Sequence, residues 1–248
     1  MSASARPGNF GATVFNELFK RHGINAIYLP RFASDAKALV AALRAFDVCG
    51  CAISSPLKSE IIPYLDELDQ IARDTDSVNT VVKRDGKLVG FNTDLYGVQL
   101  ALTEHRFKSA LIYGSGSVVN SIIGALKALG FSDISIRARR MESAKKIAVK
   151  HRIKTEPDSF ELLINATPAS MDKGNSGLFS LIAKSKAVFD LVVSPQDTPL
   201  ILEAKSSNLP SISGIEMSKW QLQKQFELYT GILVDISEID SIIGSFYR

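Results

Sequence analysis

The sequence predicts an α/β fold with two domains, the second of them a Rossmann-like doubly wound parallel sheet. Two observations predict this fold. Short apolar runs alternate with stretches of helical periodicity along both halves of the chain. Between one such run and the helix after it, the turn Gly114-Ser115-Gly116 is typical of Rossmann-like sheets. In a chain of 248 residues, 46% hydrophobic and 22% charged content is ordinary for a globular protein with a substantial core.

The elements expected in the first half follow from the spacing of apolar residues. Apolar side chains recur at helical spacing in two stretches, and two short apolar runs have the length of strands. The loop 54–58 leaves the carboxyl end of the second strand, which is where open α/β sheets bind ligands. In order, the predicted elements are a helix over residues 13–22, a strand over 26–29, a helix over 35–46 with Ser34 as its N-cap and a strand over 49–53, which together begin a βαβ pattern.

A hairpin follows, because two further apolar runs flank a short polar turn. The strands are expected over residues 78–82 and 88–91, and residues 83–87 form the turn between them. The motif Asn92-Thr93-Asp94 ends the hairpin and begins a helix.

A second series of strands and helices begins after the hairpin, and its regular alternation predicts the parallel doubly wound sheet. From about Met217 onward the chain is expected to be helical and to return to cover the first domain. We therefore place residues 1–94 and 218–248 in one domain and residues 95–217 in the other. The predicted elements of the second series are strands over 110–113, 134–136, 162–164 and 188–192 and helices over 118–129 and 141–150.

The charge and hydrophobicity of the chain indicate which class of partner the protein binds. The 29 basic and 26 acidic residues give a net charge of +3 and form no extended basic run, so the sequence does not indicate a nucleic-acid-binding protein. No run reaches the roughly 18 apolar residues of a membrane span, and residues 1–6 lack the apolar core of a signal peptide. We expect a cytoplasmic monomer or homodimer that binds a small molecule and no membrane.

A metal site is also not expected. Cys49 and Cys51 alternate on a predicted strand, a spacing that suits neither a zinc site nor a redox pair, and we predict that both are buried. The histidines stand far apart in the sequence, near predicted helix ends, and have no companion ligand nearby. They are His22, His105 and His151.

The glycine turn after the strand 110–113 is a candidate phosphate site. A side chain on Gly114 or Gly116 would keep a pyrophosphate away from the backbone N–H groups at the start of the next helix. Val119 stands in place of the usual third glycine, and two glycines alone are equally compatible with a structural turn. The next strand ends in arginines where NAD-binding proteins carry an acid, and guanidinium groups bind a 2′-phosphate through paired hydrogen bonds. These arginines indicate NADP, with a solvated basic loop as the alternative; they are Arg137, Arg139 and Arg140.

Lys58, Asn79 and Asp94 stand in short polar interruptions upstream of the glycine turn. A lysine beside a carboxylate can donate a proton to a carbonyl oxygen, so the set suggests carbonyl reduction by a nicotinamide cofactor. The alternative is structural: a surface lysine, an asparagine that braces a turn and an aspartate that caps a helix.

Short motifs along the chain match those of one enzyme family in order and approximate spacing. They are Gly50-Cys51-Ala52-Ile53-Ser54-Ser55-Pro56-Leu57-Lys58, Ser77-Val78-Asn79-Thr80, Asn92-Thr93-Asp94, Asn165-Ala166-Thr167-Pro168, Asp190-Leu191-Val192, Thr198-Pro199-Leu200 and Gln221 with Phe226. The pattern resembles the shikimate dehydrogenase family, and the resemblance covers nearly the whole chain.

The resemblance implies a two-domain, NADP-dependent enzyme that reversibly reduces 3-dehydroshikimate to shikimate without a metal. Lys58 matches the family's catalytic lysine, which would protonate the carbonyl oxygen while Asp94 orients the lysine. The first domain would bind the substrate. Within it, Ser54, Asn79 and Gln221 match positions that form hydrogen bonds with substrate hydroxyl groups.

The resemblance also implies which residues contact the cofactor in the second domain. The glycine turn would hold the pyrophosphate, and Arg139 matches the family's 2′-phosphate arginine. Thr167 would lie near the ribose, and Leu191 and Gly214 match neighbours of the nicotinamide. The expected cofactor residues are Gly114, Ser115, Gly116, Ser117, Val118, Arg137, Arg139, Arg140, Thr167, Leu191 and Gly214.

The N-terminal loop departs from the family. The two serines that bind the ring carboxylate are absent and Phe15 replaces a histidine, although Asn9 and Thr13 are candidates for polar contacts with the substrate. Val193 stands where a substrate-binding tyrosine is usual. Each lost hydroxyl donor to a buried carboxylate costs roughly 1–3 kcal/mol of binding. The chain therefore resembles a divergent shikimate dehydrogenase-like subgroup with altered substrate recognition.

Two alternatives to shikimate reduction stay open. One is an enzyme for quinate or an aminoshikimate-type substrate, and the other is a non-catalytic sensor or regulator that binds NADP or another ligand in the same fold. The chain also begins within the family's first strand or its exit loop, so we expect either a start upstream of Met1 or a shortened sheet edge.

Overall fold

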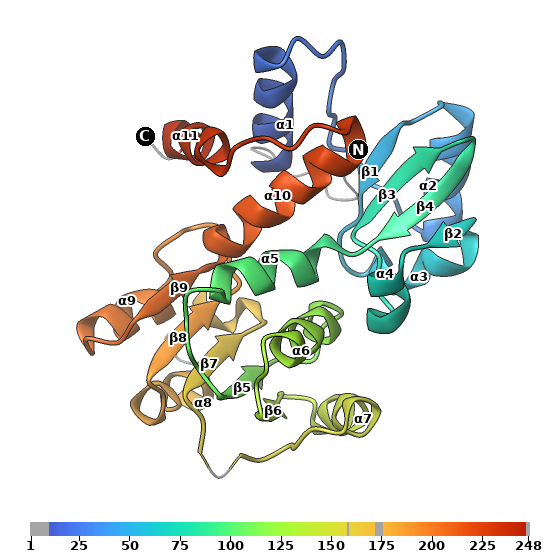
Figure 1. Ribbon diagram of the computed structural model, residues 1–248. Coiled ribbons are helices and arrows are strands. Elements are labelled where there is room, and N and C mark those ends of the chain that lie inside the picture. The colour runs from blue at the N-terminus through green and yellow to red at the C-terminus, as the bar shows by residue number, and fades with distance from the viewer. Residues whose placement is uncertain (1–9, 158, 172–175, 247–248) are drawn as a thin grey trace. The chain divides into compact units, whose positions relative to one another are not determined.

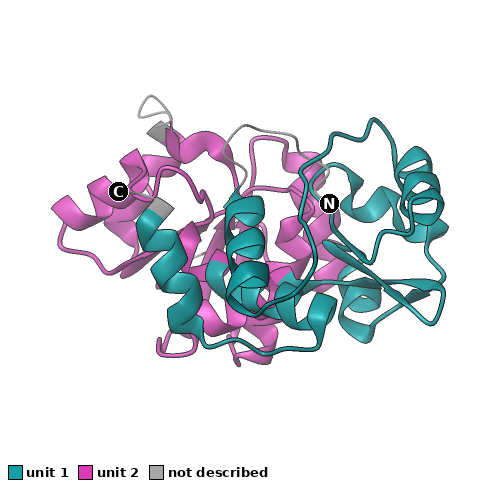
Figure 2. Ribbon diagram, turned by 90° about the horizontal axis from the view of Figure 1, so that it is seen from above, with its two compact units in different colours: residues 1–93, 219–248 teal, residues 94–218 magenta. Residues whose placement is uncertain are grey.

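The computed structural model describes residues 10–157, 159–171 and 176–246 (Figure 1). The chain forms two compact units, which Figure 2 colours separately. Unit 1 consists of Met1–Thr93 and Lys219–Arg248, and unit 2 consists of residues 94–218.

Unit 1 contains a small mixed sheet and several helices. Its elements are α1 (Phe10–Arg21), α2 (Ala36–Ala45), β1 (Gly50–Ala52), α3 (Leu57–Glu60), η1 (Ile62–Tyr64), β2 (Glu67–Leu68), α4 (Gln70–Thr75), β3 (Thr80–Arg84), β4 (Lys87–Phe91), the larger part of α10 (Gly214–Thr230) and α11 (Ile236–Phe246). The strand order is β1-β3-β4-β2. The predicted hairpin is confirmed as β3 and β4, and its turn is Asp85 and Gly86, both with positive φ, as a tight two-residue hairpin turn requires.

Two groups of apolar side chains stabilise unit 1. Leu39 and Leu43 of α2 pack with Val81 and Leu88 of the hairpin in one buried cluster. A second group is aromatic, with Phe15 of α1 at its centre. The Phe15 ring lies 4.8 Å from the ring of Tyr28 and 5.6 Å from that of Tyr229, between ring centroids.

The strand expected over residues 26–29 is not formed. Instead, the main chain of Tyr28 pairs with the side chain of Asn16 from α1: the Tyr28 N–H donates to Oδ1 at 2.7 Å, and Nδ2 donates to the Tyr28 carbonyl at 3.0 Å. An amide side chain offers the same donor and acceptor as a peptide group, so Asn16 satisfies main-chain groups that a strand ladder would otherwise pair. The expected βαβ beginning is therefore wrong, and β1 pairs antiparallel with β3.

Three smaller expectations also differ from the structure. Helix α1 begins at Phe10, before the predicted residue 13. Asp35, rather than Ser34, caps α2, because its carboxylate accepts the Ala38 N–H at 2.7 Å and a carboxylate is the stronger acceptor at a helix N-terminus. Of the two cysteines only Cys51 is buried, while Cys49, which precedes β1, is exposed.

Unit 2 is a five-stranded parallel sheet covered by helices. Its elements are α5 (Thr93–Leu102, from Asp94 on), β5 (Ser109–Tyr113), α6 (Val118–Ala128), β6 (Asp133–Arg137), α7 (Met141–His151), β7 (Leu162–Asn165), η2 (Pro168–Met171), α8 (Ser176–Phe179), η3 (Ile182–Lys184), β8 (Ala187–Asp190), α9 (Pro199–Ser206), β9 (Ser211–Ser213) and the start of α10. The strand order is β6-β5-β7-β8-β9, and every neighbouring pair is parallel. This is the doubly wound sheet that the alternating pattern predicts.

Both faces of this sheet are buried, with helices on either side (Figure 1). Ile112, Ile164 and Phe189 belong to the cluster that includes side chains of α6 and α7, whereas Leu111 and Leu163 belong to the cluster that includes α9. Strands buried on both faces have continuous apolar sequences, which is why these strands were predictable.

Gly50→Ala is expected to destabilise the protein, whereas Gly244→Ala is not. A Cβ atom at Gly50 would lie 2.4 Å from Cδ1 of Tyr229, so the ring must move at a cost of about 1–3 kcal/mol. A Cβ atom at Gly244 in α11 meets no atom within 4 Å, and alanine favours a helix interior by roughly 0.5–1 kcal/mol. Urea unfolding of both variants measures the difference, and equal stabilities would contradict the packing of Tyr229 on Gly50.

Candidate active site

Two of the predicted substrate residues and the predicted catalytic lysine lie on neighbouring segments of unit 1. Ser54 follows β1, Lys58 is the second residue of α3, and Asn79 directly precedes β3. Main-chain hydrogen bonds join these segments: the Ile53 N–H donates to the Asn79 carbonyl at 2.7 Å, and the Val78 N–H donates to the Lys58 carbonyl at 2.8 Å. The loop after β1 and the start of β3 are therefore held together at the main chain.

The amide side chain of Asn79 is engaged inside unit 1. Its Oδ1 accepts the main-chain N–H of Thr93 and the hydroxyl of Thr80, each at 2.8 Å, and its Nδ2 donates to Oγ1 of Thr93 at 3.0 Å. All three residues are buried. Asn79 thus braces the segment between β4 and α5, the structural role that the sequence left open for it.

The other predicted substrate and catalytic residues are more scattered. Gln221 is half-buried on α10, and Thr13 is exposed on α1. Asn9 lies outside the described residues. Asp94 is the second residue of α5 and the first residue of unit 2, whereas Lys58 belongs to unit 1. Their pairing stays a prediction.

A pocket of about 620 Å³ opens in unit 2 beyond the carboxyl ends of β5, β6 and β7. The chain passes from β5 to β6 on one side of the sheet and returns to β7 on the other, which is the topological switch point where such sheets bind ligands. Most of the predicted cofactor residues that lie on these strand ends line it. The lining residues are Tyr113, Gly114, Ser115, Gly116, Ala138, Arg139, Arg140, Ala166, Thr167, Pro168 and Ala169.

Glycine stands at the two turn positions, 114 and 116, for different physical reasons. Gly114 has φ of 139°, and a Cβ atom there would lie 2.9 Å from Cγ2 of Thr167 and 3.0 Å from the Ala166 carbonyl oxygen. At Gly116 a Cβ atom would meet no protein atom within 4 Å. The fold itself therefore requires glycine at position 114, whereas protein packing places no such demand on position 116.

The remaining predicted cofactor residues are not in the pocket lining. The guanidinium of Arg137 binds the carboxylate of Glu156, with Nη2 and Oε2 2.6 Å apart, whereas the neighbouring Arg139 and Arg140, which do line the pocket, are exposed. Ser117 and Val118 lie at the start of α6. Leu191 and Gly214 contact each other beyond β8 and β9, because a Cβ atom at Gly214 would lie 2.6 Å from the Leu191 carbonyl oxygen.

A buried carboxylate holds the strand ends beside this pocket. Asp190, the last residue of β8, accepts hydrogen bonds from Asn165 Nδ2 at 2.9 Å and from the Thr198 hydroxyl at 2.6 Å. It also accepts the N–H of Val192 at 3.2 Å. Asn165 in turn accepts the hydroxyl of Thr167 at 2.7 Å and donates to the Thr167 carbonyl at 2.8 Å. Through Asn165, Asp190 therefore positions Thr167, which lines the pocket.

Sequence reasoning missed one residue close to the predicted site residue Asn79, namely Gln225. Its Nε2 donates to the Thr80 hydroxyl at 2.8 Å, and the side chain is buried. The available signal was its spacing, because residues four apart share a helix face and Gln225 follows Gln221 by four on α10. The sequence motifs contain Asp190 and Thr198, but local spacing does not reveal the hydrogen bond that joins them.

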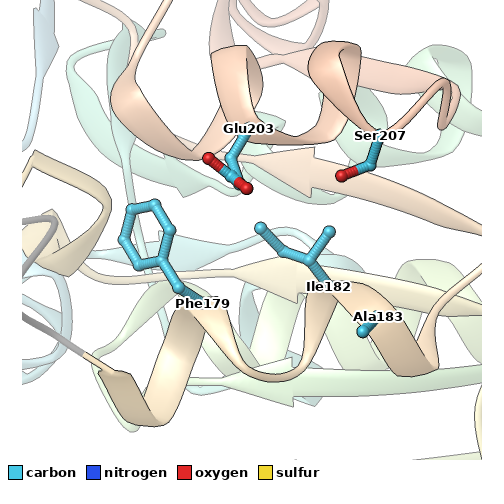
Figure 3. A pocket seen from close by; sticks show the side chains of 5 residues that line it. All are labelled: Phe179, Ile182, Ala183, Glu203 and Ser207. Carbon is cyan, nitrogen blue, oxygen red and sulfur yellow. The ribbon is translucent and has the colours of Figure 1, made fainter.

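A second pocket, of about 380 Å³, lies on another part of unit 2 (Figure 3). Phe179 and Ile182 face Glu203 and Ser207 of the neighbouring helical segment across it. None of the predicted site residues lines this pocket.

Two findings on the described part of the chain concern the arrangements that metal ions and membrane-spanning helices require. No three His, Cys, Asp or Glu side chains gather there as a metal site. Burial raises the pKa of the Cys51 thiol to about 11, so this cysteine stays protonated at neutral pH and offers no thiolate ligand. Among residues 10–157, 159–171 and 176–246, no helix has both the length and the apolar character to cross a membrane.

Comparison with known proteins decides the family. The family profile for the shikimate dehydrogenase substrate-binding domain matches residues 10–81. A shikimate dehydrogenase-like protein of Haemophilus influenzae is 33% identical over 93% of this chain and 89% of its own length. The chain belongs to the shikimate dehydrogenase family.

Further members of the family agree along nearly the whole chain. A shikimate dehydrogenase (NADP(+)) of Streptococcus sanguinis is 30% identical over 95% of this chain and 92% of its own length. The crystal structure of a Thermus thermophilus shikimate 5-dehydrogenase in complex with NADP(H) and shikimate superimposes with a TM-score of 0.85 at 27% identity, covering 96% of this chain and 95% of that one. The predicted fold class is confirmed: the chain has the family's N-terminal substrate-binding α/β domain and its Rossmann-like domain.

Thr198→Val is expected to destabilise unit 2, and Thr198→Ser is expected to restore most of the loss. The Thr198 hydroxyl donates to Asp190 and accepts the N–H of Ile201 at the start of α9, so valine removes both bonds and leaves a buried carboxylate short of a donor. We expect a loss of about 1–3 kcal/mol for valine. Urea unfolding measures it, and equal stabilities of the two variants would contradict the role of this hydroxyl.

Proposed function

We propose that this chain is an NADP-dependent oxidoreductase that reversibly reduces 3-dehydroshikimate, or a related cyclohexane or cyclohexene carboxylate ketone, to shikimate or the corresponding alcohol. Membership of the shikimate dehydrogenase family supports the reaction class. The observation that carries the proposal is the strand-end pocket with its glycine turn and two arginines, in a chain whose Lys58 main chain is hydrogen-bonded to Val78, the residue before Asn79. Unit 1 is the proposed substrate-binding domain, and unit 2 is the proposed NADP-binding domain.

The strand-end pocket fits a phosphorylated dinucleotide. Gly116 is not needed for protein packing, so its lack of a side chain serves a group that approaches the main chain from outside. Helix α6 begins at Val118, and the N–H groups and dipole of a helix N-terminus favour a phosphate there. Arg139 and Arg140 line the same pocket and offer guanidinium groups to a 2′-phosphate. NADPH, when bound, supplies the hydride.

Lys58 is the proposed proton donor. Its ammonium group gives a proton to the carbonyl oxygen of the substrate as the carbonyl carbon is reduced, and it takes the proton back in the reverse reaction. In this proposal the Asp94 carboxylate keeps the lysine protonated and oriented. Ser54, Asn79 and Gln221 hold the hydroxyl groups of the ring, because a polyhydroxylated substrate needs several fixed donors and acceptors.

One observation favours a ring acid other than shikimate as the physiological substrate. Phe15 stands where the family usually has a histidine, and its ring is fully buried against Tyr28 and Tyr229. This residue therefore contributes to the core and offers no hydrogen bond to a ligand. Quinate and aminoshikimate-type compounds should therefore be assayed as substrates together with shikimate.

Lys58→Ala is expected to lower kcat with 3-dehydroshikimate or the preferred ketone by about 10²–10⁴-fold, because the variant lacks the proton donor. The NADPH affinity, measured by fluorescence titration, is expected to stay unchanged. Absorbance of NADPH at steady state measures turnover. Wild-type turnover no higher than that of Lys58→Ala would contradict the proposed role, and tight ring-acid binding without any turnover would favour the non-catalytic sensor.

Gly116→Ala is expected to weaken NADPH binding by about tenfold or more without lowering stability, because its methyl group meets phosphate rather than protein. Gly114→Ala is expected to lower both, since φ of 139° and the contact with Thr167 strain the folded state. Calorimetric titration and thermal unfolding separate the two effects. Unchanged NADPH affinity in Gly116→Ala would contradict the placement of the pyrophosphate.

A further inference from the structure

The buried amide of Asn79 belongs to a larger chain of hydrogen bonds that reaches α10. Gln225 of α10 donates through Nε2 to Oγ1 of Thr80 at 2.8 Å, and the Thr80 hydroxyl donates to Oδ1 of Asn79, also at 2.8 Å. Asn79 and Gln225 are 1% and 2% exposed, and Thr80 is fully buried. Their polar atoms therefore depend on protein partners, because each partner lost in such a place leaves a desolvated group.

The direction of these bonds is fixed by Gln225. A hydroxyl group has one hydrogen, and the Nε2 of Gln225 can only donate, so Thr80 accepts from Gln225 and must give its hydrogen to another acceptor. That acceptor is Oδ1 of Asn79, which already accepts the Thr93 main-chain N–H. With both lone pairs of Oδ1 used, the amide of Asn79 cannot rotate by half a turn without placing N–H groups against two donors.

We propose that Gln225 is a positioning residue for the substrate-binding amide of Asn79. By donating to the Thr80 hydroxyl, Gln225 adds a second oriented donor to the Thr93 main-chain N–H, and together they keep Oδ1 of Asn79 turned into the protein, so that Asn79 meets the ring as a hydrogen-bond donor through Nδ2. This inference rests on the proposed function, in which Asn79 contacts the substrate ring.

The inference specifies the chemistry of the ring atom that Asn79 meets. A hydrogen-bond donor must face an acceptor that carries a lone pair. The ring atom that Asn79 meets is therefore an oxygen of a hydroxyl, carbonyl or carboxylate group. A protonated amine on the same ring position has no lone pair and would face the Asn79 N–H with a second donor. A fixed donor therefore discriminates between a hydroxyl and an ammonium group at one position of the ring.

Gln223 provides a matched control on the same helix. Its side chain is 7% exposed, and its Nε2 donates to the Val234 carbonyl at 2.8 Å, so it makes one buried hydrogen bond that does not involve Asn79. Gln225→Met and Gln223→Met each replace a buried amide by an apolar chain of similar length. A purely structural role predicts the same result for both variants.

The first experiment compares KM and kcat of the two variants with the preferred ring ketone. In Gln225→Met, KM is expected to rise about tenfold while kcat and the NADPH dissociation constant change less than about twofold, because only ring binding loses an oriented donor. Gln223→Met is expected to keep KM within about twofold. Thr80→Val should reproduce the rise in KM, and Thr80→Ser should not, because serine keeps the hydroxyl. An unchanged KM in Gln225→Met, or an equal rise in Gln223→Met, would overturn the inference.

The second experiment does not depend on turnover. The side-chain amide signals of Asn79 in a ¹H–¹⁵N spectrum, assigned by their loss in Asn79→Asp, are expected to shift in Gln225→Met and to stay in place in Gln223→Met. Unchanged signals in Gln225→Met would overturn the inference whether or not the protein is active. A wild-type protein that reduces no ring ketone would refute the proposed function alone, and the amide signals would still decide the role of Gln225.

Discussion

A buried amide that must have hydrogen-bond partners is the constraint on which the proposed site depends. Asn79 precedes the central hairpin of unit 1, and its side chain bonds to Thr93 at the residue just before Asp94. Its main-chain carbonyl holds the loop that leads to Lys58 through the Ile53 N–H. The same side chain is thus an internal brace and a proposed ligand group: Oδ1 and one N–H of Nδ2 bind Thr93 inside unit 1, and the proposal assigns the ring contact to Nδ2 as well.

In unit 2, the carboxylate of Asp190 supplies the hydrogen-bond partners that buried polar groups need. A parallel sheet that is buried on both faces ends in loops whose polar groups lie close to the pocket, and each needs a fixed partner. Asp190 supplies it by accepting hydrogen bonds from Asn165, Thr198 and the main chain of Val192. The strand ends are therefore held by the protein itself, which is the preorganisation that the proposed dinucleotide site needs. In both units one buried polar side chain joins segments that are distant in the sequence.

The sequence predicts the strands of unit 2 well because their apolar runs reflect burial on both faces, and it places the glycine turn and Arg139 at the pocket for the same topological reason. The local sequence pattern predicts the wrong structure where a side chain distant in the sequence satisfies the main-chain groups. Residues 26–29 have a strand-like sequence, but Asn16 satisfies the main chain of Tyr28. Short elements such as β2 and β9 carry too few residues for a periodic signal. The role of Gln225 could not be predicted, because its partner Thr80 is distant in the sequence. The same holds for the ion pair between Arg137 and Glu156, which local spacing does not indicate.

Hydride transfer to the ring is the central claim, and following the hydrogen itself tests it most directly. NADPH deuterated at both C4 positions would be incubated with the protein and 3-dehydroshikimate or a related ring ketone, and the product would be analysed by mass spectrometry and NMR. We predict one deuterium, bound to the carbinol carbon of the product. Oxidation of NADPH without deuterium in the ring, or no ring alcohol from any of the ketones, would contradict the account.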